Sequence, residues 1–353
     1  MGQKSYQKII CMTQQILFYF IVLVCGFIAT LGIRTLAMKL GIVNKPNPII
    51  PQHVKPVAYL GGIGIFGGIA IGLVACYFFQ NQLFNELIHS LKPYLALAIG
   101  ATAFLIWGVV DDLMALEAFP KFMGQVVISI VSVLLGIKTN MFDNYFIDFL
   151  FSSFWILFVV NALNFTDVCD GLVGSICCIT FLIVGILLPD IRIFCFLISA
   201  STFGFLFFNS PRASIFMGDA GSHMLGFLLA ATGIIKSHNF YFLDAAVWMA
   251  LLASLPVFEL IFITTIRLRR GMPWWKGSPD HFSLRLQKGE FTRWQIDILS
   301  AMISAVVVGI ACELNSLDLW LKISLPVFII AAYLLFAKIL MRWEVKKPEK
   351  KEA

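Results

Sequence analysis

Long runs of apolar residues constrain this sequence more than any other feature. A helix needs roughly 20 apolar residues to cross the hydrocarbon core of a bilayer. Hydrophobic residues fill 59% of the 353 positions, charged residues only 13%, and the mean hydropathy is +0.89, a balance that a water-soluble domain of this length could not carry on its surface. Eleven apolar runs lie near residues 14–36, 58–79, 93–110, 121–138, 151–164, 171–188, 192–208, 221–236, 245–266, 295–312 and 320–341. We therefore expect an all-α polytopic membrane protein with about 11 transmembrane helices, or 10 if one boundary is misplaced.

The positions of the basic residues predict the orientation, because Lys and Arg in short loops stay on the cytoplasmic side. With the N-terminus outside and the C-terminus inside, most of the 26 Lys and Arg residues fall on the inner side. The longest polar segments are too short for a core of their own. We expect residues 1–345 to form a single integral membrane domain and residues 346–353 a basic cytoplasmic tail.

Two broad classes are excluded by the placement of particular residues. The pI of about 8.9 comes from basic residues spread along loops beside the apolar runs, so topology explains it and no nucleic acid partner is expected. The eight cysteines show no C-x-x-C spacing and lie mostly inside apolar runs, where they act as small apolar residues. No disulfide framework is predicted.

A glycine pattern in the second run resembles a nucleotide fingerprint but has another explanation. Gly62-x-Gly64-x-x-Gly67 lacks a preceding strand and the acid that the dinucleotide motif requires. Gly64, Gly68 and Gly72 are four residues apart and share one helix face, which predicts close helix packing. The preceding pair, Gly61-Gly62, leaves a second interpretation open, in which the backbone approaches a ligand.

Carboxylates beside hydrocarbon are costly and by default mark functional sites. Asp111 and Asp112 end the third run, and since adjacent helical residues point about 100° apart, one of them is expected to face a polar cavity. The spacing of Asn161, Asn164, Asp167 and Asp170 by threes predicts a stripe of amide and carboxylate oxygens. Such oxygens suit a hard cation such as Mg²⁺ or a polar headgroup.

Two further patches lie on the same predicted side of the membrane. Asp219 is flanked by glycines at the start of an apolar run, where exposed N–H groups favour phosphate and the acid favours a metal. His281 and Arg285 are four residues apart, so one helix face could bring both to a phosphate. Together the patches indicate phosphoryl transfer at the membrane surface, with an anionic lipid and a soluble phosphate compound as substrates.

Two other classes also place acids in membrane proteins. A secondary transporter would carry its carboxylates in mid-span, on broken and repeated helices, whereas these acids cluster at one interface. An intramembrane aspartyl protease also needs two acids, but the glycine expected two residues before Gly218 is Phe216 and no partner motif is found. The transporter remains the alternative to a transferase.

The patches resemble those of the polyprenyl-phosphate N-acetylhexosamine-1-phosphate transferases, a family of the glycosyltransferase family 4 type. The resemblance runs through most of the chain. The matching segments are Lys45-Pro46-Asn47 with His53, Pro56 and Gly61-Gly62; Asp111-Asp112; Lys121-x-x-x-Gln125; Asn161 to Gly171; Asn209-x-Pro211 with Phe216 to Ser222; and Asp280 to Leu286.

The resemblance implies an Mg²⁺-dependent enzyme of the plasma (inner) membrane with its active site on the cytoplasmic face. It would transfer a sugar-1-phosphate, by preference N-acetylglucosamine-1-phosphate, from a UDP-N-acetyl sugar to undecaprenyl phosphate, release UMP and so start a cell-envelope glycan such as lipopolysaccharide or teichoic acid. Mn²⁺ would substitute for Mg²⁺, and a homodimer is left open.

The resemblance also assigns roles to individual residues. By similarity, Asp219 and Asn164 would bind the metal, Lys121 the diphosphate, and Phe216 with Asp170 the uracil. His281 and Arg285 would contact diphosphate or sugar, Asp111 and Asp112 would lie beside the lipid phosphate, and further substrate contacts would come from Asn47, His53, Asn161 and Asp167.

The chain departs from the commoner family pattern at three places. Asn44 stands where an Asp usually precedes the Pro-Asn pair, Ile49-Ile50-Pro51-Gln52 stand where basic residues usually precede the histidine, with one residue more, and the histidine-rich loop motif retains only His281. The absent histidine triplet favours the N-acetylglucosamine branch over the peptidoglycan translocase. Single and double displacement both remain open.

Overall fold

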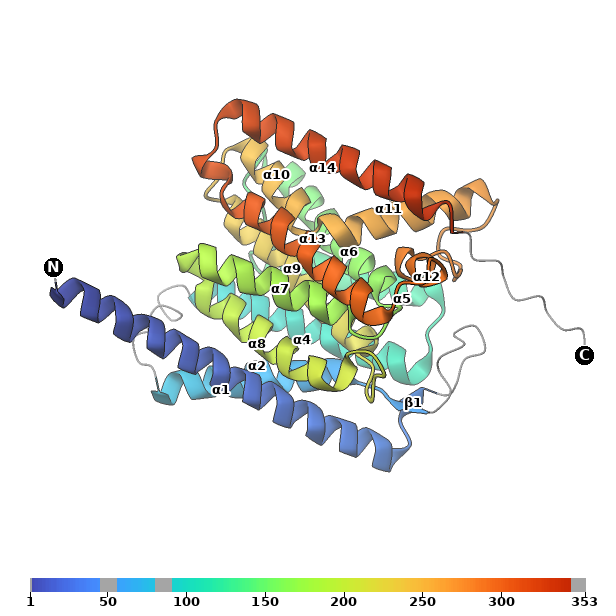
Figure 1. Ribbon diagram of the computed structural model, residues 1–353, viewed down its shortest axis with the longest axis horizontal. Coiled ribbons are helices and arrows are strands. Elements are labelled where there is room, and N and C mark those ends of the chain that lie inside the picture. Colours follow the sequence, from blue (N-terminus) through green and yellow to red (C-terminus); the bar gives the residue numbers. More distant parts are fainter. Residues whose placement is uncertain (1, 45–55, 80–90, 344–353) are drawn as a thin grey trace, which may run out of the picture.

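The computed structural model describes residues 2–44, 56–79 and 91–343, and almost all of its regular structure is helical (Figure 1). The helices are α1 (Gly2–Leu40), α2 (Gly61–Phe79), α4 (Leu91–Met114), α5 (Ala118–Leu134), α6 (Tyr145–Thr166), α7 (Leu172–Leu187), α8 (Arg192–Asn209), α9 (Gly218–Ser237), α10 (Phe242–Leu252), α11 (Ser254–Arg269), α12 (Phe282–Lys288), α13 (Arg293–Cys312) and α14 (Leu319–Leu340). Two 3₁₀ turns, Pro189–Ile191 and Leu314–Ser316, and two short strands, β1 (Val43–Asn44) and β2 (Val57–Ala58), complete the described elements. The expected all-α membrane class is confirmed.

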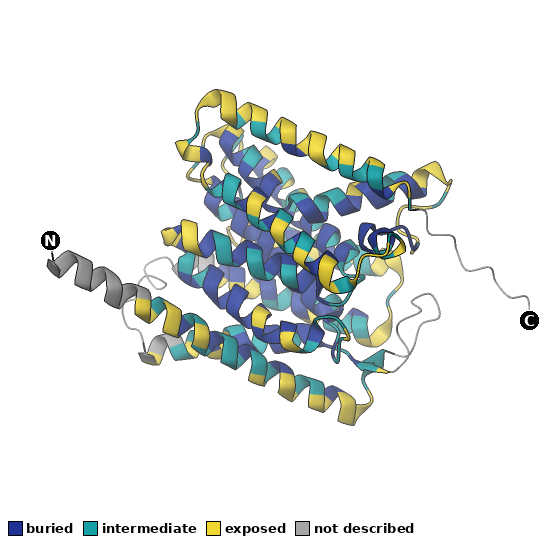
Figure 2. Ribbon diagram, in the orientation of Figure 1, coloured by how far each residue is buried: buried dark blue, intermediate teal, exposed yellow. Residues whose placement is uncertain are grey.

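Helix α9 is the centre of the bundle, and nearly all of its residues are buried (Figure 2). It packs between α4 and α6. The approach of α4 is close because it has Gly108 at the contact, where a Cβ would lie 2.4 Å from the Cα of Ala220. This packing brings the end of α4 against the first turn of α9, where the predicted acids lie.

The glycine face of α2 packs against α1 and α8, as the spacing of its glycines predicts. A Cβ on Gly64 would lie 2.8 Å from the Cα of Thr30, and a Cβ on Gly68 would lie 2.5 Å from the Cα of Gly26. The Ser201 hydroxyl of α8 donates to the Ile65 carbonyl across the same contact, at 2.6 Å. Gly62 approaches the backbone of Gly221, so this close contact is with α9.

A small backbone assembly fixes the loop before α9. Strands β1 and β2 pair antiparallel, and Ala58 forms a bridge with Ile215. The Phe216 N–H donates to the Ala58 carbonyl at 2.9 Å, while the N–H groups of Gly61 and Gly62 donate to the carbonyls of Phe216 and Met217. The second apolar run was expected to be helical from residue 58, but its helix begins at Gly61 because this backbone pairing occupies the residues before it.

Each of the eleven apolar runs overlaps a helix in the described residues, with one correction. The run at 245–266 was expected to be one span, and the structure divides it into α10 and α11, which meet at a bend of 72°. Pro256 has no N–H to donate to the carbonyl of Leu252, four residues earlier, and its ring clashes there. By length and composition, six described helices could cross a membrane, or seven if the bent pair is one span.

Candidate functional site

Asp111 and Asp112 end α4 and have different partners. The Asp111 carboxylate is buried, accepts a hydrogen bond from the Leu116 N–H at 2.9 Å and lies 2.7 Å from the Lys121 ammonium on α5. The Asp112 carboxylate instead accepts from the N–H groups of Asp219 and Ala220, at 2.7 and 3.1 Å. As expected from their helical offset, the two acids face different surroundings.

Asp112 accepts hydrogen bonds from backbone N–H groups at the N-terminus of α9, where unpaired N–H groups and the helix dipole favour a negative charge. Gly218 makes this approach possible: its φ is +74°, and a Cβ there would lie 2.5 Å from an oxygen of Asp112. The sequence suggested that these N–H groups could bind phosphate. In the structure, those of Asp219 and Ala220 bind a carboxylate of the protein.

Asp219 lies beside Asp111, with a lysine between them. The Lys121 ammonium is 2.7 Å from an oxygen of each carboxylate. Asn164 on α6 donates from Nδ2 to Asp219 and to the Ser222 hydroxyl, the latter at 3.0 Å. We call Asp111, Asp112, Lys121, Asn164 and Asp219 the acidic centre.

The acidic centre is extended by a buried network that includes a histidine that the sequence analysis did not identify. Asn161 donates from Nδ2 to Gln125 Oε1 at 2.8 Å, and Gln125 Nε2 lies 3.0 Å from His223 Nε2. His223 is fully buried, and its Nδ1 has no partner among the described residues. Its spacing of four from Asp219 was the available signal.

Asp167 follows the last residue of α6, and its surroundings disfavour a negative charge. Burial raises its pKa to about 8 from the ordinary 3.8, and the carboxylates of Asp219, Asp112 and Asp170 add to the shift. Burial, followed by the charges of Asp112 and Asp219, also raises the pKa of the Tyr59 phenol. Asp167 and Tyr59 therefore both lie within the electrostatic field of the acidic centre.

Because the pKa of Asp167 is raised, the stability of the folded state is predicted to decrease as the pH rises. The folded state keeps a proton that the unfolded chain loses, so the contribution of this carboxyl is complete below about pH 4 and declines as the pH rises to about 8. In metal-free detergent solution we expect the melting temperature to fall between pH 5 and 8, and the Asp167→Asn variant to show a smaller fall. An Asp143→Asn variant at an exposed position should keep the wild-type slope. Equal slopes in wild type and Asp167→Asn would contradict this prediction.

Asp170 is held by cationic and backbone partners. It forms an ion pair with Arg293 of α13 and accepts from the Ala213 N–H at 3.2 Å. The side chain of Asn209 fixes the same region, since its Oδ1 accepts from the Gly171 N–H at 3.0 Å and its Nδ2 donates to the Ile215 carbonyl at 2.9 Å. These contacts join the Asn161 and Phe216 segments of the sequence.

Asp297 on α13 is a buried acid that the sequence analysis did not identify. Its side chain lies against Gly171, and neither carboxylate oxygen has a hydrogen-bond partner among the described residues. An unsatisfied buried polar group costs roughly 1–3 kcal/mol. The position therefore reduces stability.

We expect Asp297→Leu, which removes both unsatisfied oxygens at similar volume, to raise the melting temperature by roughly 2–4 °C for each kcal/mol recovered. Asp148→Leu is the matched control, because the Asp148 carboxylate is equally buried but accepts from the Thr139 hydroxyl at 2.7 Å and from the Met141 N–H at 2.9 Å. That variant should melt at a lower temperature than wild type. Thermal unfolding in detergent measures both, and a decrease for Asp297→Leu would contradict the explanation.

The remaining predicted residues lie around this region or outside the described residues. The rings of Phe216 and Tyr59 meet edge to face, with centroids 6.3 Å apart. Asn47 and His53 lie outside the described residues.

His281 and Arg285 are both buried. The His281 Nδ1 lies 2.7 Å from a Glu259 oxygen, and the Arg285 guanidinium pairs with Asp280 at 2.8 Å and donates to the Leu340 carbonyl at 3.3 Å. Their predicted contacts with substrate remain predictions.

The residues of the acidic centre fit a hard cation that is held partly by substrate. No group of three or more His, Cys, Asp or Glu within the described ranges is arranged as a metal site. Mg²⁺, however, usually takes one or two carboxylates, waters and substrate phosphate oxygens. Asp219 supplies a carboxylate. Asn164 uses its Nδ2 to donate hydrogen bonds to Asp219 and Ser222, which leaves its amide oxygen able to coordinate a metal ion.

The fold and the acidic centre define an all-α integral membrane protein with a cluster of acids at the ends of its central helices. The chain is similar to glycosyl transferase family 4 over residues 94–237, the part that the model of that family matches. That match contains the acidic centre and the Asn161 and Phe216 segments.

Curated relatives extend the similarity over most of the chain. A protein of Bacillus subtilis (strain 168) named probable undecaprenyl-phosphate N-acetylglucosaminyl 1-phosphate transferase is 26% identical, covering 91% of this chain and 90% of the relative. Proteins of Yersinia pestis and Escherichia coli (strain K12), both named undecaprenyl-phosphate alpha-N-acetylglucosaminyl 1-phosphate transferase, are each 27% identical, covering 89% of this chain and 88% of the relative.

Proposed function

We propose that this protein transfers an N-acetylhexosamine-1-phosphate, by preference N-acetylglucosamine-1-phosphate, from a UDP-sugar to undecaprenyl phosphate. The products are undecaprenyl-diphospho-sugar and UMP, and the lipid product starts a cell-envelope glycan. The observation that carries the proposal is the Lys121 ammonium between the carboxylates of Asp111 and Asp219, within the region that the family model matches. The names of the relatives support the lipid acceptor and the sugar. They do not favour a transporter.

The reaction exchanges one phosphoanhydride for another. An oxygen of the lipid phosphate attacks the sugar-linked phosphorus, a new P–O–P bond forms, and the bond to the UMP oxygen breaks. The second pKa of a phosphomonoester is about 6, so the lipid phosphate is largely a dianion at neutral pH and needs little help from a base. The main task of the protein is to bring two anions together.

The residues of the acidic centre divide this task. Lys121 offers a positive charge for the phosphates, and Asp111 holds its ammonium in place. Asp112 fixes the first turn of α9 and thereby the position of Asp219. Positioning and prearranged charge of this kind supply much of the rate of phosphoryl transfer.

We propose Mg²⁺, with Mn²⁺ as a substitute, as the cofactor, with Asp219 and Asn164 as its protein ligands. When bound there, the ion would neutralise negative charge on the phosphates. The oxygen-only character of the available donors supports this choice over a softer metal.

For the topology we propose eleven spans, with the N-terminus outside and the acidic centre at the cytoplasmic face of the plasma membrane. The basic segment at 267–293 and the lysines after α14 support this orientation. The overlap of every apolar run with a helix supports the number of spans.

A direct assay tests the proposed function. Purified protein is incubated with undecaprenyl phosphate, Mg²⁺ and each of several UDP-N-acetyl sugars, and the released UMP is measured. We expect UMP release with UDP-N-acetylglucosamine, dependent on both lipid and metal. Because the two anhydrides are similar in energy, labelled UMP should also exchange into UDP-sugar when lipid product is present. Absence of UMP release with every donor would refute the proposal.

A further inference from the structure

Within the described residues, two polar contacts join α5 to α9. Lys121 and Gln125 are one turn apart on α5, and Asp219 and His223 are one turn apart on α9. The first contact is the ion pair of Lys121 with Asp219, at 2.7 Å, which we call the charged contact. The second, which we call the neutral contact, joins Gln125 Nε2 to His223 Nε2 at 3.0 Å. Both residues of the neutral contact are fully buried, so water does not compete for it.

The hydrogen-bond network determines which nitrogen of His223 carries the proton. Asn161 donates from Nδ2 both to the Leu157 carbonyl and to Gln125 Oε1, each at 2.8 Å. A carbonyl can only accept, which fixes Nδ2 of Asn161 as the donor and Oε1 of Gln125 as an acceptor. Gln125 Nε2 must then donate to His223. His223 Nε2 therefore accepts, and the proton of the neutral imidazole lies on Nδ1.

The Nδ1 of His223 gains nothing from this arrangement. It is enclosed and has no hydrogen-bond partner in the part of the chain that the structure describes, and burial of an unpaired donor costs free energy. An apolar side chain at position 223 would avoid that cost. What the imidazole does provide is the acceptor for Gln125.

The neutral contact matters because little else holds α5 beside α9. Helix α5 packs against α4 and α6, and within the described residues it has no comparable packing against α9. In the proposed reaction, Lys121 turns towards the phosphates of the donor and Asp219 towards the metal, which opens the charged contact. The contact between Gln125 and His223 carries no charge and can persist through that step.

We propose that His223 is a positioning residue, which acts through Gln125 to hold α5, and with it Lys121, beside Asp219 while the charged contact is open. Asn161 takes part by orienting the Gln125 amide. The proposal rests on the proposed function, because it assumes that Lys121 and Asp219 exchange their mutual contact for substrate and metal.

Two substitutions of His223 test which of its nitrogens is needed. The amide of a glutamine reaches the place of Nε2, whereas the amide of an asparagine reaches only the place of Nδ1. We expect His223→Asn to lower kcat for UMP release by up to roughly 100-fold, as a misplacement of about 1 Å can cost, with a smaller effect on KM for the UDP-sugar. His223→Gln should restore most of kcat. The opposite order of the two variants would assign the role to Nδ1 and overturn the proposal.

Hydrogen exchange on the full chain tests the same contact without sugar transfer. Asp219→Asn removes the negative charge from the charged contact, and exchange of the backbone amides of α5 is then followed by mass spectrometry. We expect faster exchange in α5 when His223→Asn is added to Asp219→Asn, because local opening is easier where fewer contacts hold a helix. Adding His223→Gln should leave exchange near the level of Asp219→Asn alone. Equal exchange in all three proteins would overturn the proposal.

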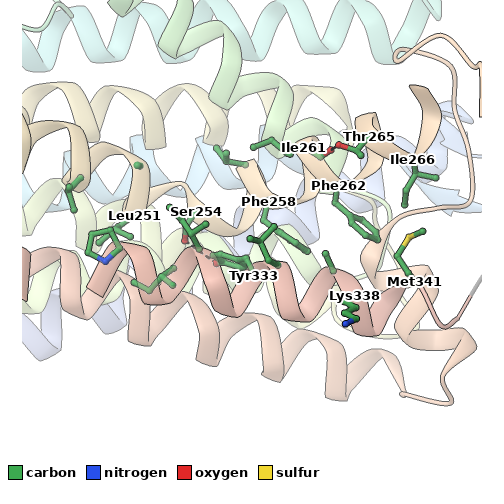
Figure 3. A pocket seen from close by; sticks show the side chains of 18 of the residues that line it. Leu251, Ser254, Phe258, Ile261, Phe262, Thr265, Ile266, Tyr333, Lys338 and Met341 are labelled. Carbon is green, nitrogen blue, oxygen red and sulfur yellow. Dashed lines mark hydrogen bonds between the residues drawn. The ribbon is translucent and has the colours of Figure 1, made fainter. Parts of the chain in front are cut away.

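Tyr333→Phe is the control for loss of a hydrogen bond between helices. It removes the hydroxyl that lies 3.1 Å from the Ser254 hydroxyl, between α11 and α14 (Figure 3), two helices that carry no residue of the acidic centre. In the Asp219→Asn background it should leave exchange in α5 unchanged. An equal acceleration by Tyr333→Phe and His223→Asn would mean a general loosening of the bundle and would also overturn the proposal. These exchange measurements need no sugar transfer, so their failure and a failure of the proposed function can be distinguished.

Discussion

Asp219→Asn is expected to abolish UMP release, with a loss of roughly 10³-fold, because it removes the carboxylate that meets Lys121 and Asn164 and that we assign to the metal. The size follows from the several kcal/mol that a bound cation contributes to stabilising transition-state charge, at 1.36 kcal/mol for each factor of ten. The fold should survive, since Asp112 binds the backbone N–H of residue 219 and not its side chain.

The matched control is Asp190→Asn. Asp190 also pairs with a lysine, with Lys236 Nζ at 2.8 Å, but lies outside the acidic centre. We expect that variant to keep its activity. The measurement is the initial rate of UMP release over a range of Mg²⁺ concentrations, with thermal unfolding as the check on folding. Mg²⁺-dependent turnover at the wild-type rate in Asp219→Asn would remove Asp219 from the site.

Lys121→Met should affect both rate and stability. Its ammonium lies between two carboxylates, so its removal leaves Asp111 and Asp219 in repulsion, and breaking a partly buried pair in this way is destabilising. We expect a lower melting temperature together with a rate reduced by roughly 10²- to 10³-fold, the range found when one prearranged donor is removed.

A second substitution separates these two effects. Adding Asp111→Asn to Lys121→Met removes the repulsion, so stability should recover while the rate stays low. Lys236→Met, which breaks the other lysine pair, should leave the rate unchanged. If Asp111→Asn restored the rate together with stability, Lys121 would be purely structural.

Apolar run length predicted the helices of this protein well, because burial of hydrocarbon in the bilayer decides them locally. The glycine spacing of α2 likewise predicted a close contact, since small residues four apart allow one helix to approach another. The bend at Ala253 was missed although its cause, Pro256, is in the sequence: the run is apolar on both sides of the proline, and hydropathy does not register a lost hydrogen bond.

The acidic centre was predicted as a set of residues but not as a geometry. Asp111 and Asp219 were identified as charged groups next to apolar runs, and Lys121 was identified through the family resemblance. Their bridging contact joins residues up to 108 positions apart, which no local pattern encodes. His223 and Asp297 were missed for a related reason: each lies within an apolar helix, and only the packing shows that they have unsatisfied polar atoms.

The lysine between Asp111 and Asp219 gives the resting protein an internal counter-ion. Chelation should therefore leave an intact, inactive protein, unlike zinc-finger domains, which unfold when the metal is withdrawn. Loss of activity in EDTA and its return on adding back Mg²⁺ would then be a reversible switch, and the protein could remain folded in the membrane through a period of magnesium shortage.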